Sequence, residues 1–221
     1  MKILIVSATE AEISPFLAHL STNEALKSSV EVLVTGVGMV ATTYQLTRQL
    51  AKNKYDLAIQ AGVGGAFSRA IELGEVVEVT TERFGDIGAE DNGNYLDMFT
   101  DIPLIDPNVF PFSEALLHAN HPAEMVSLGL RQVSGLTVNT VSGTEAAVAM
   151  RVQRFGCDVE SMEGAAFFYV CKQENTPMLQ MRAISNYVEP RNRASWKMKE
   201  AVIALNAMLI ETVNKISGLG S

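Results

Sequence analysis

Short runs of aliphatic and β-branched residues recur along this chain, and stretches with helical spacing separate several of them. Four such runs occupy residues 2–7, 30–35, 56–61 and 75–80. Runs of this length and composition are typical of buried strands. Residues 10–20 and 39–52 carry apolar side chains at helical spacing between the first three runs. Strands that alternate with helices predict an α/β fold around a parallel or mixed sheet.

The alternation resumes in the second half of the chain after a long interruption. Residues 84–112 are polar, poorly periodic and rich in Gly, Pro and Asp, which is typical of a functional excursion. A helix is expected to resume near residues 113–118. Further strands are predicted at 134–141 and 178–184, and helices at 144–154 (capped by Ser142 or Thr144), 162–174 and 194–217. With 221 residues and no linker-like segment, we expect one domain over residues 1–221.

Two glycine clusters follow predicted strands and indicate a ligand crevice. GVGMVA (36–41) matches the G-x-G-x-x-A pattern of dinucleotide-binding turns, and GVGGA (62–66) follows the next strand. A dinucleotide site also requires an acidic residue at the end of that next strand, which here ends in Gln60 and Ala61. We therefore expect no NAD and no other cofactor. Glycines at strand ends, among them Gly64, allow a substrate to approach the backbone closely.

Charge and cysteine usage exclude several classes of function. The net charge is −8 and the sequence pI is about 4.9, without the clustered Lys and Arg that nucleic acid or an anionic membrane would require. Cys157 and Cys171 have no metal-ligand spacing, so no metal site is expected.

The apolar run at the N-terminus is too short for a signal peptide, and no apolar stretch is long enough to span a membrane. The expected compartment is the cytoplasm.

Several separated segments carry a resemblance to a known family. They are MKILIVSATEAE (1–12), TGVGMVA (35–41), AGVGGAF (61–67), SMEGAA (161–166) and RAISN (182–186). In order and spacing these segments resemble the methylthioadenosine/S-adenosylhomocysteine nucleosidases of the nucleoside phosphorylase superfamily. The resemblance implies an α/β fold, a nucleoside phosphorylase-like three-layer α/β/α sandwich with a mixed central sheet. It also implies an enzyme that cleaves N-ribosidic bonds of purine nucleosides.

The same resemblance assigns roles to individual residues. Glu12 takes the place of the catalytic acid/base, and Met162 with Glu163 takes that of the ribose-binding pair. Arg182 matches an arginine near the nucleophilic water, and Asn186 stands where adenine-specific members have a purine-binding aspartate. This sequence departs from the family pattern in two places. Val63 replaces a serine near the water, and one extra residue precedes Met162, which leaves Glu160 as a second candidate for the ribose contact.

The residue types suit the chemistry that the resemblance implies. A carboxylate near the anomeric carbon can take a proton from the attacking water, and a second carboxylate can bind the ribose diol and stabilise positive charge on the sugar. The alternatives are a solvated first-turn glutamate for Glu12 and a glutamate that favours a helix N-terminus for Glu163. The Asn186 amide offers one donor and one acceptor, which fits a 6-oxopurine better than adenine; the alternative is a turn asparagine.

Three further segments are most similar to one family within this superfamily, the futalosine hydrolases. They are GDIGAED (85–91), NTVSGTEA (139–146) and SNYVEPRNRASW (185–196). This resemblance implies release of hypoxanthine from futalosine in menaquinone biosynthesis. Futalosine carries a benzoate, for which Arg191 or Arg193 is the expected clamp, with Trp196 or Phe84 as an apolar wall. The alternative for each arginine is a solvated basic loop. A homodimer or higher homo-oligomer is also implied.

Two rival functions share this scaffold. A nucleoside phosphorylase would need an arginine-bearing glycine loop after the first strand, but residues 14–25 contain neither Gly nor Arg. A non-catalytic nucleoside-binding protein would not need the paired carboxylates of Glu12 and Glu163. Hydrolysis is therefore the expected reaction.

Overall fold

The computed structural model describes residues 1–120 and 129–218. The strands are β1 (Ile3–Ser7), β2 (Val30–Val34), β3 (Leu57–Ala66), β4 (Val76–Phe84), β5 (Gly88–Asp91), β6 (Asn94–Asp97), β7 (Leu117–His118), β8 (Arg131–Thr137), β9 (Val159–Ser161) and β10 (Met178–Tyr187). The helices are α1 (Glu10–Thr22), α2 (Glu24–Lys27), α3 (Met39–Lys52), α4 (Glu145–Phe155), α5 (Gly164–Gln173) and α6 (Met198–Ile216), with a short 3₁₀ helix at Arg193–Ser195.

The central sheet is mixed, as predicted. β1 pairs in parallel with β2 and β3, and β3 pairs in parallel with β10. β10 then runs antiparallel to β4, which pairs in parallel with β8, and β8 pairs in parallel with β9. β9 returns antiparallel to β3, so the pairings among β3, β10, β4, β8 and β9 close into a ring. The ring therefore places strands side by side that are far apart in sequence, such as β3 and β10.

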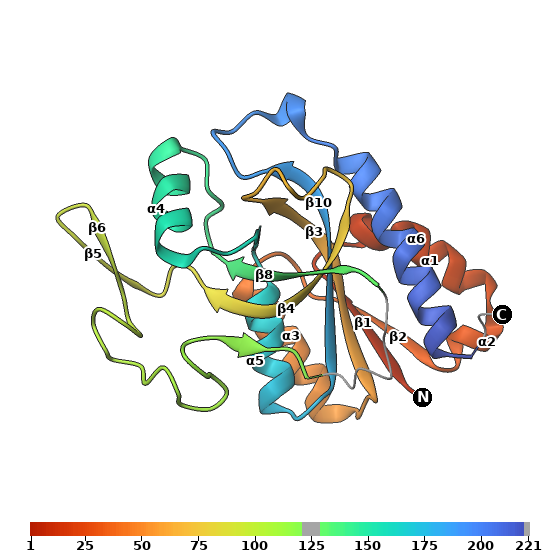
Figure 1. Ribbon diagram of the computed structural model, residues 1–221. Coiled ribbons are helices and arrows are strands. Elements are labelled where there is room, and N and C mark those ends of the chain that lie inside the picture. Colours follow the sequence, from red (N-terminus) through yellow and green to blue (C-terminus); the bar gives the residue numbers. More distant parts are fainter. Residues whose placement is uncertain (121–128, 219–221) are drawn as a thin grey trace.

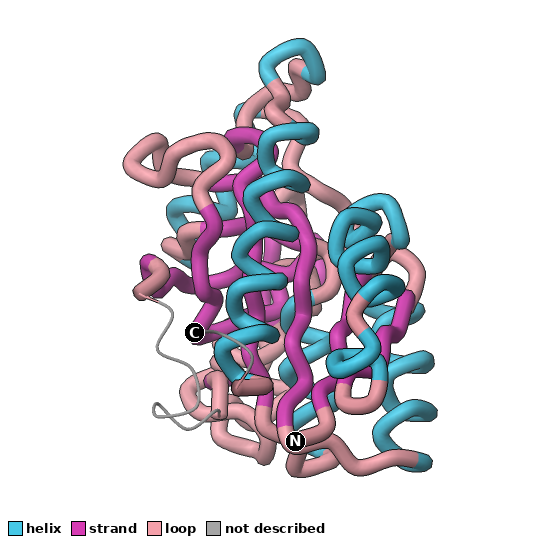
Figure 2. Tube along the Cα trace, turned by 90° about the vertical axis from the view of Figure 1, so that its right-hand side faces the viewer, coloured by secondary structure: helices cyan, strands magenta, loops and turns pink. Residues whose placement is uncertain are grey.

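Helices cover the sheet on both faces, which confirms the three-layer sandwich (Figure 1). α1 and α6 pack on one face, where Phe16 and Leu205 are buried against β1, β3 and β10. α3 and α5 pack on the other face, where Leu46 and Phe167 are buried against the same strands. Figure 2 shows the strands running behind the helices of the first face. All five residues of β1 are buried, as expected for a strand that is covered on both faces.

Two expectations about local structure were wrong. The second glycine cluster (62–66) does not follow its strand as a turn would, because β3 continues through it to Ala66. Residues 113–118 do not form a helix, because Glu114 and Ala115 have positive φ angles of 53° and 61°, and a short strand follows. The excursion also contains the β5–β6 hairpin, which projects from the body in Figure 1.

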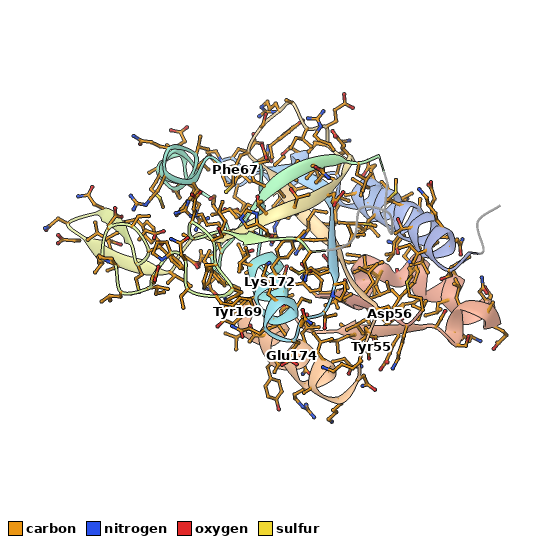
Figure 3. The ribbon with its side chains drawn as sticks, turned by 60° about the horizontal axis from the view of Figure 1, so that its bottom comes forward. Tyr55, Asp56, Phe67, Tyr169, Lys172 and Glu174 are labelled. Carbon is orange, nitrogen blue, oxygen red and sulfur yellow. The ribbon has the colours of Figure 1, made fainter. Side chains whose placement is uncertain are left out.

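The direction of β3 defines which end of the sheet holds the glycines. Figure 3 labels Tyr55 and Asp56 just before β3, and Glu174, which precedes β10, lies on the same side. Phe67, which follows β3, lies at the opposite end. The carboxyl ends of parallel strands are where ligands bind in open α/β sheets, so the site is expected beside Phe67 rather than beside Tyr55. No helix within the described ranges is long and apolar enough to cross a membrane.

Candidate active site

A cavity of about 790 Å³ opens at the carboxyl end of the sheet. Its walls come from the start of α1, the second half of β3, the segment around β9, the end of β10 and the start of α6. Among the lining residues are Glu12, Val63, Gly64, Met162, Glu163, Asn186, Arg191, Trp196 and Lys199. Most of the residues predicted from the sequence therefore lie in one cavity, although they come from segments spread over the whole chain.

Glu12 is held by hydrogen bonds on both carboxylate oxygens. Thr9 caps α1, and its backbone N–H and hydroxyl donate to Glu12 Oε2 at 3.1 and 2.8 Å. The backbone N–H of Val63 donates to Glu12 Oε1 at 3.0 Å. Glu12 is thus a half-buried group tied to β3, and not a solvated first-turn glutamate. Val63, which replaces the serine of the family pattern, contributes its backbone N–H here.

The structure separates the two candidate glutamates by their partners. Glu163 is buried, accepts from the backbone N–H of Gly38 at 3.0 Å and lies 3.4 Å from Arg182 Nη1. Glu160 also lines the cavity, but both of its oxygens already have partners within the protein: Arg151 pairs with it at 2.6 Å, and Ser142 donates to it through its N–H and its hydroxyl. Gly38, which lies in the turn before α3, and Arg182 therefore hold the Glu163 carboxylate at the cavity.

Arg182 lies beneath the cavity and begins a buried polar chain. It is 1% exposed, and its Nη1 donates to the Val63 carbonyl at 3.2 Å. Its Nε donates to Gln180 Oε1 at 2.8 Å, and Gln180 Nε2 donates to Glu82 Oε1 at 3.0 Å. The Thr137 hydroxyl donates to Glu82 Oε2 at 2.9 Å. Burial raises the pKa of Glu82 to about 7, although the Gln180 hydrogen bond and the charge of Arg182 act in the opposite direction.

The absence of a side chain at Gly62 is what allows this arrangement. A Cβ at that position would lie 2.7 Å from Arg182 Nη1 and 3.1 Å from Glu12 Oε1. The strand must therefore present bare backbone where the guanidinium and the carboxylate approach it. The glycines of β3 serve close approach rather than a turn.

Asn186 lines the cavity with part of its hydrogen-bonding capacity in use. Its Oδ1 accepts from the Ser185 hydroxyl at 2.8 Å, and its Nδ2 donates to the Tyr187 carbonyl at 3.0 Å. An amide oxygen has a second lone pair, and an amide nitrogen has a second hydrogen. The side chain can therefore still offer one acceptor and one donor to a ligand.

Basic and aromatic side chains line the outer part of the cavity, and the acidic Glu189, which pairs with Arg69, is also among the lining residues. Arg191, Trp196 and Lys199 line it, and the Arg191 guanidinium lies 5.5 Å from the centre of the Trp196 ring. Two residues expected at the cavity, the clamp candidate Arg193 and the wall candidate Phe84, are not brought to it. Arg193 stacks over Trp196 at 6.0 Å but does not line the cavity, and Phe84 packs edge-on against Phe112. Both positions depend on how a loop or strand end is oriented, which sequence order alone does not specify.

The sequence analysis did not identify three features of the site: the Thr9 cap, Lys199, and the buried polar chain below Arg182. The spacing of Thr9 and Glu12 is that of a capping box, which was a usable signal. Lys199 lies one helical turn before Val202 and Ile203 on α6, so only the packing of this helix reveals that it faces the cavity. The chain from Arg182 through Gln180 to Glu82 joins β10 to β4 and had no local signal. Within residues 1–120 and 129–218, no three His, Cys, Asp or Glu side chains are grouped as metal ligands would be.

Comparison with known proteins identifies the class to which this fold and site correspond. The phosphorylase superfamily model matches residues 2–214, so the chain belongs to the phosphorylase superfamily. At the level of a particular enzyme, the chain is 32% identical over 211 residues to the futalosine hydrolase of Thermus thermophilus, covering 91% of each chain.

Solved structures show the same fold at lower sequence identity. The futalosine hydrolase of Helicobacter pylori matches with a TM-score of 0.79 and 16% identity over 97% of this chain and 98% of the other. The methylthioadenosine/S-adenosylhomocysteine nucleosidase of Neisseria meningitidis, solved with methylthio-immucillin-A, also has a TM-score of 0.79, at 18% identity over 97% and 99% of the two chains.

Proposed function

We propose that this protein hydrolyses the N-ribosidic bond of futalosine, releasing hypoxanthine and dehypoxanthinylfutalosine as a step of menaquinone biosynthesis. The similarity to the Thermus thermophilus futalosine hydrolase supports the substrate. The observation that carries the chemistry is the pair of carboxylates, Glu12 and Glu163, held at one cavity by backbone N–H groups from β3 and the Gly38 turn.

The two carboxylates have different roles in this proposal. Glu12 takes a proton from the attacking water, and the donors on both of its oxygens keep its orientation constant. Glu163 accepts from the ribose hydroxyls, and its negative charge stabilises the positive charge that develops on the sugar. Arg182 holds Glu163 and the Val63 carbonyl in place from below, and Met162 covers the sugar.

The base is bound by Asn186 in this proposal. Its free amide hydrogen donates to the 6-oxo group, and its free lone pair accepts from the N7–H of the departing hypoxanthine. The N7 proton comes from water as the N-ribosidic bond breaks, while the attacking water adds its oxygen to the sugar and gives its own proton to Glu12. An adenine would present a 6-amino donor to the amide donor, which leaves buried polar groups unpaired and disfavours binding.

Two basic side chains in the outer cavity suit the acidic end of futalosine. Arg191 and Lys199 offer two cations for the benzoate carboxylate, and Trp196 offers a face for its ring. A cavity of about 790 Å³ is large enough for a nucleoside with an aromatic substituent. Lys199 takes the place that Arg193 had in the expectation from sequence.

Base release from matched substrates tests the proposal. Purified protein is incubated with futalosine, aminofutalosine, methylthioadenosine or inosine, each with and without inorganic phosphate, and the products are separated by chromatography. We expect hypoxanthine from futalosine at a rate that phosphate does not change. Release that requires phosphate would make the protein a phosphorylase, and preferred release of adenine would contradict the 6-oxopurine assignment.

The assembly and the compartment are also proposals. Val37, Val40 and Tyr44 are exposed at 57%, 81% and 59%, and Val37 also lines the cavity, so we propose that a second copy covers this apolar surface in a homo-oligomer. Light scattering on the purified protein tests this.

The proposed compartment is the cytoplasm. Cys157 and Cys171 are both free, which is consistent with a reducing compartment.

A further inference from the structure

Helix α1 is interrupted directly after Glu12. Ile13 has a φ of −120° and a ψ of 16°, outside the helical range, and Pro15 follows inside the helix. In an unbroken α-helix the Phe16 N–H would donate to the Glu12 carbonyl, four residues earlier. The break removes that hydrogen bond in a buried region, so both groups require another partner.

The side chain of Asn206 on α6 supplies both partners. Its Oδ1 accepts from the Phe16 N–H at 2.9 Å, and its Nδ2 donates to the Glu12 carbonyl at 2.8 Å. The second amide hydrogen donates to the Val202 carbonyl of its own helix at 2.7 Å. Asn206 is 1% exposed, so its amide bridges the two halves of α1 without competition from water.

The first turn of α1 is therefore held at both of its ends. Thr9 caps it at the start, and Asn206 holds the carbonyl of Glu12 where the turn ends. The same helix α6 lines the cavity through Val202 and Ile203. The position of the Glu12 carboxylate relative to a bound nucleoside thus depends on a helix that begins nearly 190 residues later in the chain.

We propose that Asn206 is a positioning residue for the hydrolytic reaction, which sets the place of the Glu12 carboxylate by bridging the break in α1. This inference rests on the proposed nucleosidase function and on the role of Glu12 as its base. Asn206 itself does not line the cavity and is not expected to touch the substrate.

The first test compares two Asn206 variants with a matched control on the same helix. Asn206→Leu keeps the approximate volume but cannot bridge Phe16 and Glu12, and Asn206→Ser retains only a hydroxyl that can donate within α6. Both variants are expected to lower kcat at least tenfold with KM within about threefold, because a small displacement of the base affects the chemical step more than binding. The control is Thr212→Val, since Thr212 is fully buried on α6 and its hydroxyl has no partner in the described ranges.

The second test asks whether the effect passes through Glu12. In a Glu12→Gln background, Asn206→Leu is expected to change the residual kcat less than twofold, because the group that it positions is already lost. An Asn206→Leu protein with kcat within threefold of wild type would overturn the proposal. So would an equal loss in both backgrounds, or a loss matched by Thr212→Val.

A measurement that does not depend on turnover tests the role of Asn206 separately from the proposed nucleosidase function. Amide hydrogen exchange at residues 10–17 of α1 should be faster in Asn206→Leu than in Thr212→Val, and unchanged exchange would contradict the bridging role. A wild-type protein that releases no base from any nucleoside would contradict the proposed function, while this exchange experiment would still decide whether Asn206 holds the helix break.

Discussion

Glu12 serves both the helix and the cavity. Its Oε2 completes the capping box with Thr9, and its Oε1 accepts from the Val63 N–H. A carboxylate that is hydrogen-bonded through both oxygens has little rotational freedom to lose when the substrate binds, which favours a general base. The same contacts make the side chain part of the local structure, so the test of its role needs an isosteric replacement.

Replacement of this carboxylate by an amide should separate chemistry from binding. Glu12→Gln keeps the shape but removes the basic oxygen, so we expect kcat for hypoxanthine release to fall roughly 100-fold or more, with KM changed only a few-fold. Glu10→Gln is the matched control, because Glu10 is exposed in the same helical turn and does not line the cavity. Near-normal kcat in Glu12→Gln would rule out the assigned role.

The base preference should depend on the amide of Asn186. Asn186→Asp replaces the donor with an acceptor, so an ionised carboxylate repels the 6-oxo group, while a protonated one can serve N7 and accept from a 6-amino group. We expect the ratio of kcat/KM for futalosine to that for aminofutalosine to fall roughly 10- to 100-fold, which corresponds to about 1–3 kcal/mol. Steady-state kinetics with both substrates on both proteins measures the ratio. A ratio that the substitution leaves unchanged would show that another group reads the base.

Strand β3 contributes backbone to the site where other strands contribute side chains. Its N–H at Val63 binds Glu12, its carbonyl at Val63 binds Arg182, and Gly62 leaves room for both side chains. A strand with these glycines has less side-chain surface to pack, which weakens it in isolation. Pairing on both sides compensates, because β10 pairs with β3 from Ala58 to Ala66, while β1 pairs with its first half and β9 with Gly65 and Ala66.

A single methyl group in this strand should therefore impair catalysis. Gly62→Ala places a Cβ 2.7 Å from Arg182 Nη1 and 3.1 Å from Glu12 Oε1, so one or both side chains must move. We expect kcat to fall at least tenfold and the free energy of unfolding to fall by about 1–3 kcal/mol. Gly143→Ala is the control, since a Cβ there meets no atom within 4 Å. Activity kinetics and urea denaturation of both variants check this, and equal activities would disprove the steric argument.

The buried chain from Arg182 to Glu82 links the site to the stability of the whole protein. Glu82 is 1% exposed, and burial raises its pKa from 4.5 to about 7. Because the folded state holds this proton more tightly than the unfolded state, the folded protein binds more protons between these two pH values. The contribution of Glu82 to the free energy of unfolding is therefore fully present below pH 4.5, and it is lost as the pH rises through 7.

Comparison with a variant that does not titrate isolates this contribution. Relative to Glu82→Gln, the wild-type protein should lose up to about 3 kcal/mol of unfolding free energy between pH 4.5 and pH 8. The difference between the two proteins cancels the titration of all other groups. Urea denaturation across this pH range provides the measurement, and a difference that is independent of pH would mean that Glu82 is not the titrating group.

Patterns within single segments predicted many of the helices and strands, because the spacing of apolar residues within a segment reflects the conformation that the segment itself prefers. The helix expected at residues 39–52 has those bounds in the structure, since its apolar spacing and its preceding glycine act within one element. The resemblance carried by short segments also placed Glu12, Glu163 and Asn186 in one cavity. These segments bear the groups that the chemistry needs, and the end of a mixed sheet is where such segments meet.

Long-range contacts determined the remaining features, which no local pattern reports. Glu163 and Glu160 are three residues apart, and what distinguishes them is that Gly38 binds the first and Arg151 binds the second. The strand character of the second glycine cluster depends on pairing with β10, which lies more than 100 residues away. The bridge from Asn206 to Glu12 likewise joins two helices that only the packed core brings together. Hydrogen-bond partners of buried groups are set by the packing of distant elements, so these features follow from the three-dimensional arrangement.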